Sequence, residues 1–209
     1  MRLQELGGQH NTDKGDLAHS FRGVSYLDVY ASYLADIREQ VRCVLELGVL
    51  GGSSLKMWCD YFPQATVWGV DINPDSVRPY GPRIQTVLGS QADPAAIAQV
   101  APGQMIDLVI DDGSHLVDHM VDSFKLLWPR VNNGGFYVME DMRLTWNHDI
   151  TPTRIEWPGQ NCNGPDTNFV NVRAKMQALF DEKIDAMDKL QGDVRFCHFW
   201  PMMVVFKKV

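Results

Sequence analysis

The sequence of 209 residues lacks the features that mark membrane, secreted and nucleic-acid-binding proteins. It has no apolar run near the ~20 residues that span a bilayer. Residues Met1–Asp16 are polar and mixed in charge, unlike a secretory signal. The formal net charge is -7 and no Lys/Arg cluster occurs, so the dense positive charge that nucleic-acid binding requires is missing. We therefore expect neither a membrane nor a nucleic-acid partner.

Cysteine is also scarce. The four cysteines are far apart and form no CxxC pair, which argues against a disulfide framework or a zinc site: Cys43, Cys59, Cys162 and Cys197. The pattern is typical of reduced thiols in a cytoplasmic protein. Internal repeats and low-complexity tracts are absent as well, and the length suits one domain with a full core.

The sequence does contain a regular alternation of short apolar segments and amphipathic segments. The predicted strands are Cys43–Leu47, Thr66–Asp71, Ile84–Leu88, Ile106–Asp111 and Phe136–Met139. The predicted helices are Ser25–Val41, Ser53–Tyr61, Ala95–Val100 and a segment from Val117 that Asn133-Gly134-Gly135 ends. Such alternation predicts an α/β fold with a mostly parallel sheet and helices on both faces. Arg195–Trp200 and Met202–Phe206 predict two further strands, which add an antiparallel strand to that sheet.

Two segments depart from the alternation. Residues 1–24 carry glycines among polar residues and are predicted to form an irregular N-terminal arm, which leaves 25–209 as a single domain. Residues 143–166 contain prolines, glycines and two tryptophans without periodicity. A loop of that length inside a compact domain is usually functional or disordered. The tryptophans favour an ordered wall or lid at a substrate site, with Trp146 as a candidate contact.

Residues 46–54 form a glycine-rich connection from the first predicted strand into a helix. Glycine at 48, 51 and 52 lets the backbone approach a ligand, and the helix N-terminus offers unpaired N–H groups. Asp71 ends the next strand, where a carboxylate can accept hydrogen bonds from ribose hydroxyls. Leu50 stands where the G-x-G-x-x-G fingerprint of dehydrogenases has glycine, so NAD is not favoured. The alternative is that these glycines serve only a tight turn and bind no ligand.

Two acidic clusters, Asp111–His115 and Glu140-Asp141, follow neighbouring predicted strands. The carboxyl ends of parallel strands open onto one crevice, so both clusters face the same space. Carboxylates that converge there would repel one another without a cation, and oxygen ligands suit Mg2+. We assign Asp112, Glu140 and Asp141 as metal ligands. Asp111 is left for a cofactor-binding or structural role, such as capping the next helix, and capping of a turn is the alternative for Asp141.

His115 is the candidate general base, because it shares a loop with these carboxylates. A divalent cation lowers the pKa of a bound hydroxyl. A neutral imidazole can then accept the proton. His119 lies one helical turn further on, and a structural role is favoured for it.

These motifs resemble those of known methyltransferases. The stretch 46–54 resembles motif I of class I S-adenosylmethionine methyltransferases. Over nearly the whole chain, further strings resemble the Mg2+-dependent O-methyltransferases of macrolide deoxysugars and their cephalosporin-type relatives: residues 11–15, 111–115, 123–129, 134–141 and 198–200. The resemblance implies a Rossmann-like class I methyltransferase fold with a seven-stranded sheet, and S-adenosylmethionine and Mg2+ as cofactors.

The resemblance also implies residue roles. The cofactor positions are Glu46, Gly48, Gly51, Ser53 and Asp71, with Ser90 and Gln91 near adenine and Asp111 nearby. Asp112, Glu140 and Asp141 would bind Mg2+, and His115 would act as base. Thr12, Asp13, Lys14 and Tyr26 would line the cofactor or substrate entrance.

The predicted activity is Mg2+-dependent transfer of the methyl group of S-adenosylmethionine to a hydroxyl of a sugar or a sugar-containing natural product. A catechol-type phenolic O-methyltransferase and a non-enzymatic S-adenosylmethionine-binding protein are the alternatives. The expected partner is a small hydroxylated acceptor, whose identity the sequence leaves open. Assembly into a homo-oligomer is left open as well.

Overall fold

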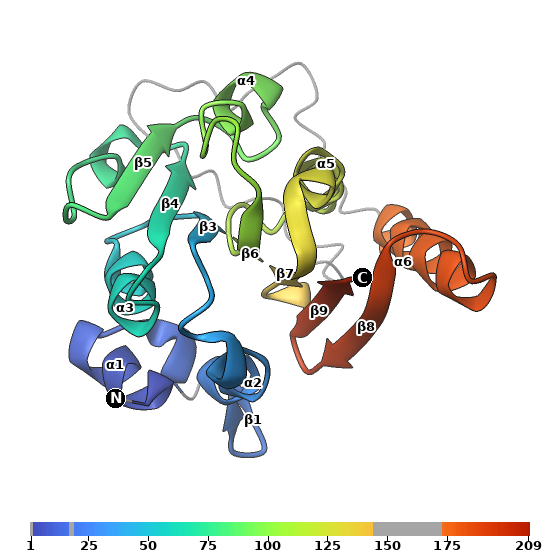
Figure 1. Cartoon of the computed structure of the whole chain (residues 1–209), viewed down its shortest axis with the longest axis horizontal. Helices are drawn as coiled ribbons and strands as arrows, with labels where there is room; N and C mark the ends of the chain where they lie inside the picture. Colours follow the sequence, from blue (N-terminus) through green and yellow to red (C-terminus); the bar gives the residue numbers. More distant parts are fainter. Residues whose placement is uncertain (1, 17–18, 144–172) are drawn as a thin grey trace.

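The computed structural model describes residues 2–16, 19–143 and 173–209. Seven strands form one sheet in the order β5-β4-β3-β6-β7-β9-β8 (Figure 1). Their bounds are Cys43–Leu47 for β3, Thr66–Asp71 for β4, Ile84–Leu88 for β5, Ile106–Asp111 for β6, Val131–Met139 for β7, Val194–Trp200 for β8 and Met203–Lys208 for β9. Only β9 runs antiparallel to its neighbours, β7 and β8. The predicted sheet is therefore confirmed.

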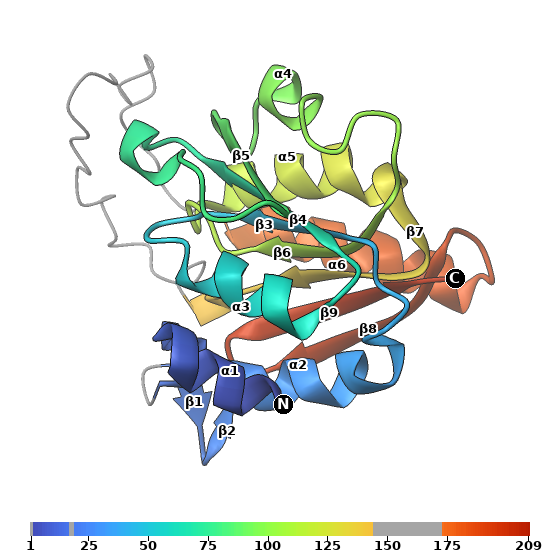
Figure 2. The same ribbon diagram turned by 60° about the vertical axis from the view of Figure 1, so that its left-hand side comes forward.

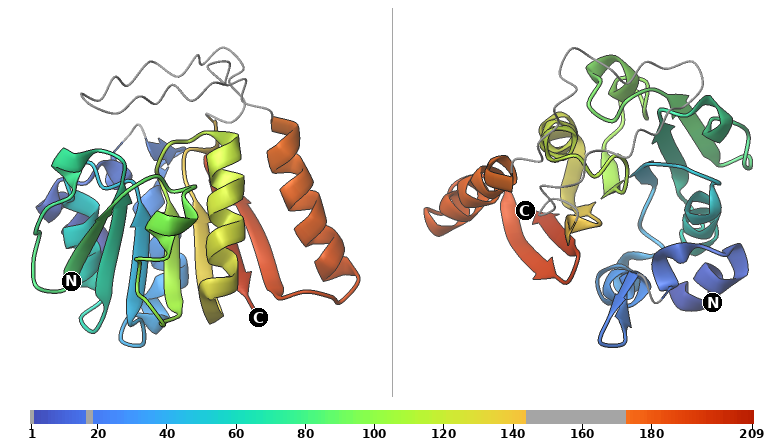
Figure 3. Two further views of the ribbon diagram at one scale, coloured as in Figure 1. Left: turned by 90° about the horizontal axis from the view of Figure 1, so that it is seen from above. Right: turned by 180° about the vertical axis from the view of Figure 1, so that it is seen from behind.

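Helices cover both faces of this sheet (Figures 2 and 3). One face carries α1 (Leu3–His10), α2 (Tyr26–Leu34) and α3 (Ser53–Tyr61), and the other carries α4 (Pro94–Ile97), α5 (Val117–Leu127) and α6 (Arg173–Asp188). A small ribbon of β1 (Ser20–Phe21) and β2 (Val24–Ser25) precedes α2. No helix within the described ranges has the length and apolar character needed to cross a membrane.

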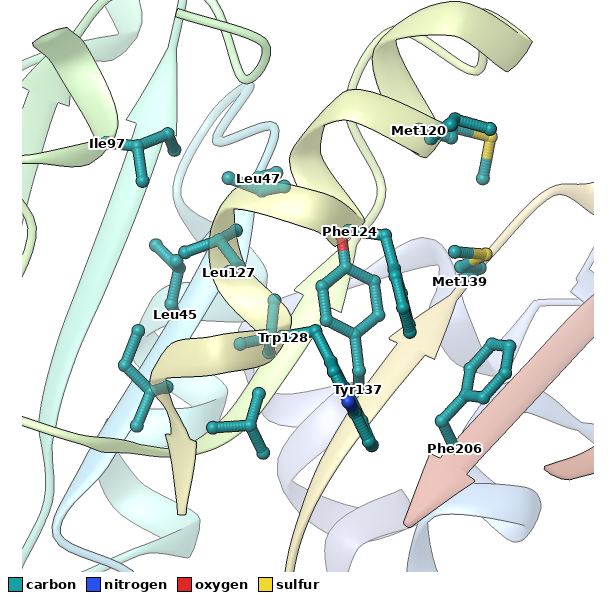
Figure 4. Close-up of a cluster of buried hydrophobic side chains, with 14 of the residues drawn as sticks. Leu45, Leu47, Ile97, Met120, Phe124, Leu127, Trp128, Tyr137, Met139 and Phe206 are labelled. Carbon is teal, nitrogen blue, oxygen red and sulfur yellow. The ribbon is translucent and has the colours of Figure 1, made fainter. Parts of the chain in front are cut away.

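The strands bury both faces because their side chains alternate between two cores. Val44 points to the core beneath α1–α3, whereas Leu45 points to the core beneath α4–α6. Figure 4 shows the second core, in which Phe124 of α5 and Trp128, the residue after α5, stack over the sheet with ring centroids 5.2 Å apart. Tyr137 meets Phe124 edge-on at 4.8 Å. These contacts hold α5 against β7, whose carboxyl end precedes Glu140 and Asp141.

The N-terminal segment differs from the prediction. Residues 3–10 form α1 instead of an irregular arm, with Leu3 and Leu6 buried against the first core. The glycines misled the prediction, because glycine usually weakens a helix. Gly7 is needed for packing, since a Cβ there would lie 2.3 Å from a methyl carbon of Leu27.

Other elements also differ from the prediction. The helix predicted over Ser25–Val41 is shorter, since α2 ends at Leu34 and a 3-10 turn, Ala35–Ile37, follows it. The helix after Val117 ends at Leu127, before Pro129, instead of at the Asn133–Gly135 string. β7 begins at Val131 and includes that string, with a register shift opposite β6 between Ile106 and Leu108. α6 was not predicted at all. The segment 144–166, predicted as a wall or lid, lies outside the described residues.

Candidate active site

The turn Gly48–Gly52, here called the glycine turn, joins β3 to α3 at the carboxyl edge of the sheet. Asp71, at the end of β4, holds it in place. Its Oδ2 accepts hydrogen bonds from the N–H groups of Val49 (2.8 Å) and Leu50 (3.0 Å), and its Oδ1 accepts one from Asn73 (2.8 Å). A carboxylate has about four lone-pair sites, so Asp71 retains capacity for one further donor, such as a ribose hydroxyl.

The glycine turn also contacts the loop after β6. Gly48 has a φ of +90°, and a Cβ there would lie 2.2 Å from the carbonyl oxygen of Asp112. The Asp112 N–H donates to Leu47 O at 3.1 Å. Gly51, in contrast, has open space beside it as far as the described residues are concerned, and Ser53 is half-buried at the start of α3. A ligand can therefore approach at Gly51, while Gly48 fixes the turn to the acidic loop.

Asp111 belongs to the interior. It is fully buried, and its carboxylate accepts hydrogen bonds from Gln91 Nε2 (2.8 Å), Ser123 Oγ (2.6 Å) and Tyr137 Oη (2.8 Å). Burial raises the pKa of Asp111 to about 6, although these hydrogen bonds oppose the shift. Of the two roles left open for Asp111, the structure supports the structural one over cofactor contact.

Gln91 links this network to the acidic loop. Its Oε1 accepts a hydrogen bond from Ser114 N–H at 2.7 Å, so both ends of its buried amide are used inside the protein. The side chain of Ser90 accepts from Ala92 N–H at 3.2 Å and is half-buried. Ser90 is therefore better placed than the Gln91 side chain to make the predicted adenine contact.

Asp112, His115 and Asp141 come together at the carboxyl edge, with one ligand atom from each within 4.8 Å of the others. His115 Nε2 lies 3.7 Å from Asp141 Oδ2. His115 and Asp141 both have positive φ, 56° and 52°. Such backbone costs energy for residues other than glycine, and it often occurs at functional sites. The two carboxylates supply oxygen ligands that fit a divalent cation, and the imidazole lies beside them. We call these three residues the acidic triad.

Glu140 is not one of the acidic triad, but Lys14 connects it to Asp112. Its Oε2 accepts a hydrogen bond from Lys14 Nζ at 2.6 Å, and its Oε1 accepts one from the Tyr30 hydroxyl. Lys14 Nζ also donates to Asp112 Oδ2 at 2.6 Å and lies 3.1 Å from Glu46 Oε1. Of the three predicted metal ligands, the structure brings Asp112 and Asp141 together with His115, and Lys14 contacts both Asp112 and Glu140.

Lys14 and Glu46 are therefore internal residues. The side chain of Lys14 is only 2% exposed and that of Glu46 is 0% exposed. Burial disfavours a charged lysine, but the neighbouring carboxylates outweigh it and raise the pKa of Lys14 well above its usual value. Lys14 was expected at an entrance and Glu46 at the cofactor; both instead meet beneath the glycine turn.

Tyr26 is also buried, and it positions Asp141. Its hydroxyl donates to Asp141 Oδ1 at 2.9 Å and accepts from Asp141 N–H at 3.2 Å. Burial, aided by Asp141, raises the pKa of Tyr26, so the phenol keeps the hydrogen that it donates. Tyr26 therefore supports the positive φ of Asp141 instead of lining an entrance.

The remaining predicted positions are less informative. Thr12 is buried in the turn after α1, where its N–H donates to Gly7 O at 3.1 Å, whereas Asp13 is exposed. His119 Nδ1 lies 3.0 Å from Ser114 Oγ, which agrees with a structural role. Trp146 lies outside the described residues.

The sequence reasoning missed His19 and Tyr30. His19 Nε2 lies 4.0 Å from Asp141 Oδ1, and its Nδ1 lies 3.0 Å from the carbonyl oxygen of Asp13. Because a carbonyl only accepts, Nδ1 carries the hydrogen of this pair, and a neutral His19 has its lone pair on Nε2, toward Asp141. Asp141 is thus flanked by two imidazoles. Only the position of His19 after the 11–15 string could have indicated this.

Comparison with known proteins identifies the family of the chain. The family model described as Rhamnosyl O-methyltransferase/CmcI matches residues 27–191. The chain belongs to this family. A rhamnosyl tetracenomycin-C 2'-O-methyltransferase of Streptomyces olivaceus is 39% identical over 152 residues, covering 69% of this chain and 38% of the relative. The mycinamicin VI 2''-O-methyltransferase of Micromonospora griseorubida is 35% identical, covering 78% and 40%.

Among solved structures, the MycE methyltransferase of mycinamycin biosynthesis, in complex with Mg and SAH, has a TM-score of 0.72 and 29% sequence identity. The alignment covers 100% of this chain and 55% of MycE. The expected Rossmann-like methyltransferase fold is therefore confirmed. The chain spans about two fifths of the length of its curated O-methyltransferase relatives. The family match begins at Leu27, so Lys14, His19 and Tyr26 lie before it.

Proposed function

We propose that this protein is a Mg2+-dependent O-methyltransferase that moves the methyl group of S-adenosylmethionine to a hydroxyl of a sugar or a glycosylated natural product. The acidic triad carries the proposal. It lies at the same sheet edge as the glycine turn, so a cation site and a methyl-donor site adjoin.

The relatives support this substrate class. The Streptomyces olivaceus enzyme is named for methylating a rhamnosyl group. MycE has been solved with Mg, SAH and mycinamycin VI. A small glycosylated acceptor is therefore the class that we propose here. Cytoplasmic location, assembly into a homo-oligomer and the division into an arm and one domain stay predictions.

The proposed chemistry is nucleophilic substitution at the methyl carbon. The acceptor oxygen forms the new C–O bond as the C–S bond of the sulfonium breaks, and S-adenosylhomocysteine leaves. A divalent cation, when bound, lowers the pKa of the acceptor hydroxyl.

The residues of the chain have separate tasks in this scheme. Asp112 and Asp141 would hold the cation, and the Nε2 atom of His115 would take the hydroxyl proton. Asp71 would accept a hydrogen bond from the ribose of the donor, beside Gly51 where the turn is open. Tyr26 keeps the Asp141 carboxylate in place through its hydroxyl.

The test measures methyl transfer from labelled S-adenosylmethionine to methyl α-L-rhamnopyranoside by the purified protein. We expect transfer with Mg2+, loss of transfer with EDTA, recovery on adding Mg2+, and loss in Asp141→Ala. Full activity in EDTA and in Asp141→Ala would refute the metal role.

Two alternatives give different results in the same assay. Catechol methylation without rhamnoside methylation would indicate a phenolic O-methyltransferase. Tight S-adenosylmethionine binding by calorimetry, without transfer to either acceptor, would indicate a binding protein.

A further inference from the structure

Helix α2 carries two buried tyrosines, Tyr26 and Tyr30, which both contact the residues directly after β7. These residues, Glu140 and Asp141, are called the acidic pair here. The Tyr26 hydroxyl donates to Asp141 Oδ1 at 2.9 Å. The Tyr30 hydroxyl donates to Glu140 Oε1. Residues four apart lie on one face of a helix, so a single face of α2 contacts both carboxylates of the acidic pair.

We propose that α2 is the positioning element of the cation site. Tyr26 and Tyr30 each hold one carboxylate of the acidic pair and leave its other lone pairs for a divalent ion shared with Asp112. The inference deepens the proposed function and rests on its divalent ion. Both tyrosines are positioning residues, because they act through the carboxylates and not on the acceptor.

Both carboxylates keep lone pairs for a cation. A carboxylate has about four lone-pair sites. Glu140 gives one to the Tyr30 hydroxyl and one to the ammonium of Lys14, 2.6 Å from Oε2, which leaves about two. Asp141 gives one to the Tyr26 hydroxyl and is a member of the acidic triad. The phenols therefore hold the acidic pair without using up its capacity for a metal.

The backbone after β7 explains why one helix can contact both carboxylates. Successive side chains of an extended strand point to opposite sides. Asp141 has a φ of 52°, so the chain leaves the extended conformation directly after Glu140. A residue other than glycine keeps such a backbone only where its surroundings stabilise it. The Tyr26 hydroxyl contributes to this stabilisation, since it also accepts from the Asp141 N–H at 3.2 Å.

Helix α2 is itself held firmly at this end. The Ser25 side chain accepts from the Asp28 N–H, and the Asp28 carboxylate accepts from the Ser25 N–H at 2.8 Å. This capping box fixes the start of the helix at Tyr26. The Tyr30 ring meets the ring of Trp58 in α3 edge-on, with centroids 5.0 Å apart. Phenylalanine at either tyrosine position keeps the ring and removes only the hydroxyl, so it tests the hydrogen bond alone.

The test measures the Mn2+ affinity of the purified protein by calorimetry and electron paramagnetic resonance, with no acceptor present. We expect Tyr30→Phe to weaken Mn2+ binding roughly tenfold, as the loss of a bond that orients a metal ligand does. The double variant Tyr26→Phe/Tyr30→Phe should lose the product of the two single losses, because the phenols act on separate carboxylates. A Tyr30→Phe variant with the native Mn2+ affinity would overturn the inference.

Tyr137→Phe is the matched control for a merely structural effect. Tyr137 is buried like Tyr30, and its hydroxyl donates to the buried carboxylate of Asp111 at 2.8 Å. Asp111 is not one of the predicted metal ligands. Tyr137→Phe should therefore lose stability in urea, as Tyr30→Phe does, but bind Mn2+ like the native protein. Equal weakening of Mn2+ binding in both variants would mean that the effect is structural, and it would overturn the inference.

Failure of the proposed function gives a different result. A native protein that binds no Mn2+ would refute the metal role, and the role of α2 with it. A native protein that binds Mn2+ and transfers methyl groups, with Tyr30→Phe unchanged in both, would refute only the role of α2. The two failures are therefore distinguishable.

Discussion

The glycine turn lies beside a carboxylate cluster, which consists of the acidic triad together with Glu46 and Glu140. The two regions are held together in opposite ways. Asp71 holds the turn through backbone N–H groups 21 and 22 residues away. The cluster instead joins Lys14 to Glu140 across 126 residues and Tyr26 to Asp141 across 115. The turn is a local motif, whereas the cluster exists only after the chain has folded.

This difference affects what each region can tolerate. The turn depends on backbone shape, so glycine substitutions should damage it most. The cluster depends on charge balance. Removing one charged or hydrogen-bonding side chain should therefore change the affinity of the cluster for an ion more than it changes the stability of the fold. The following predictions test that contrast, starting with the largest expected effect.

His115→Ala should lower kcat for methyl transfer between 10² and 10⁴-fold, the range in which a general base contributes. Affinity for S-adenosylmethionine should change little, because His115 lies in the cluster and not in the turn. Steady-state kinetics with methyl α-L-rhamnopyranoside and calorimetry with the cofactor measure the two quantities. His119→Ala is the control, and it should lose less than about tenfold. A similar small loss in His115→Ala would exclude the base role.

Gly48→Ala should be the most destabilising change in the turn, at roughly 4 kcal/mol, since a left-handed backbone and a clash with Asp112 coincide. The new Cβ would lie 2.2 Å from the Asp112 carbonyl oxygen at a φ of +90°. Urea unfolding measures the loss. Gly51→Ala, which meets open space, should cost less than about 0.5 kcal/mol. Equal losses in both variants would mean that the turn and the acidic loop are not coupled through Gly48.

The same contrast explains what the sequence could reveal. Four strands, β3 to β6, were predicted with the observed bounds, because each is a short apolar run flanked by residues that favour turns. The positions of Gly48, Asp71, Asp112 and Asp141 could be predicted for a related reason, as each lies at or just after the end of a strand at one sheet edge, while their roles stay predictions. Helix α1 was missed because it contains two glycines, of which Gly7 packs against Leu27, a tertiary contact.

The charge partners of the cluster could not be predicted in this way. Nothing near Glu140 in the sequence indicates that Lys14 and Tyr30 occupy its oxygens, so it was grouped with Asp141 as a ligand. His19 and Tyr26 present the same problem, since a partner more than a hundred residues away leaves no local periodicity or motif. Local motifs therefore placed the acids at the strand ends but gave no indication of the distant residues that contact them.

Asp111→Asn should alter the pH dependence of stability by about 3 kcal/mol, because the folded-state pKa of Asp111 is raised from 3.8 to about 6. The folded state holds this proton more tightly than the unfolded state does. The stabilising contribution of Asp111 is therefore present below about pH 4 and is lost as the pH rises to 6. Urea unfolding between pH 4 and 7 should show the wild type losing stability relative to Asp111→Asn.

Ser123→Ala sharpens the same measurement. It removes the hydroxyl that donates to Asp111 Oδ2 at 2.6 Å, and this hydrogen bond opposes the raised pKa. The loss of stability with rising pH should then extend to higher pH. Parallel curves for the wild type and Asp111→Asn would show that Asp111 does not titrate in this range.

Tyr26→Phe should have the smallest effect, about 1 kcal/mol in the affinity for Mn2+, or roughly five- to tenfold. The change removes only the hydroxyl that donates to Asp141 Oδ1 and accepts from the Asp141 N–H. Mn2+ titration of the purified protein measures it. Tyr33→Phe is the matched control, because its hydroxyl contacts His198 and Trp200, away from Asp141. If Tyr26→Phe bound Mn2+ as tightly as Tyr33→Phe, the backbone alone would position Asp141. The cluster would then depend on nearby residues, as the glycine turn does, and not on a side chain 115 residues away.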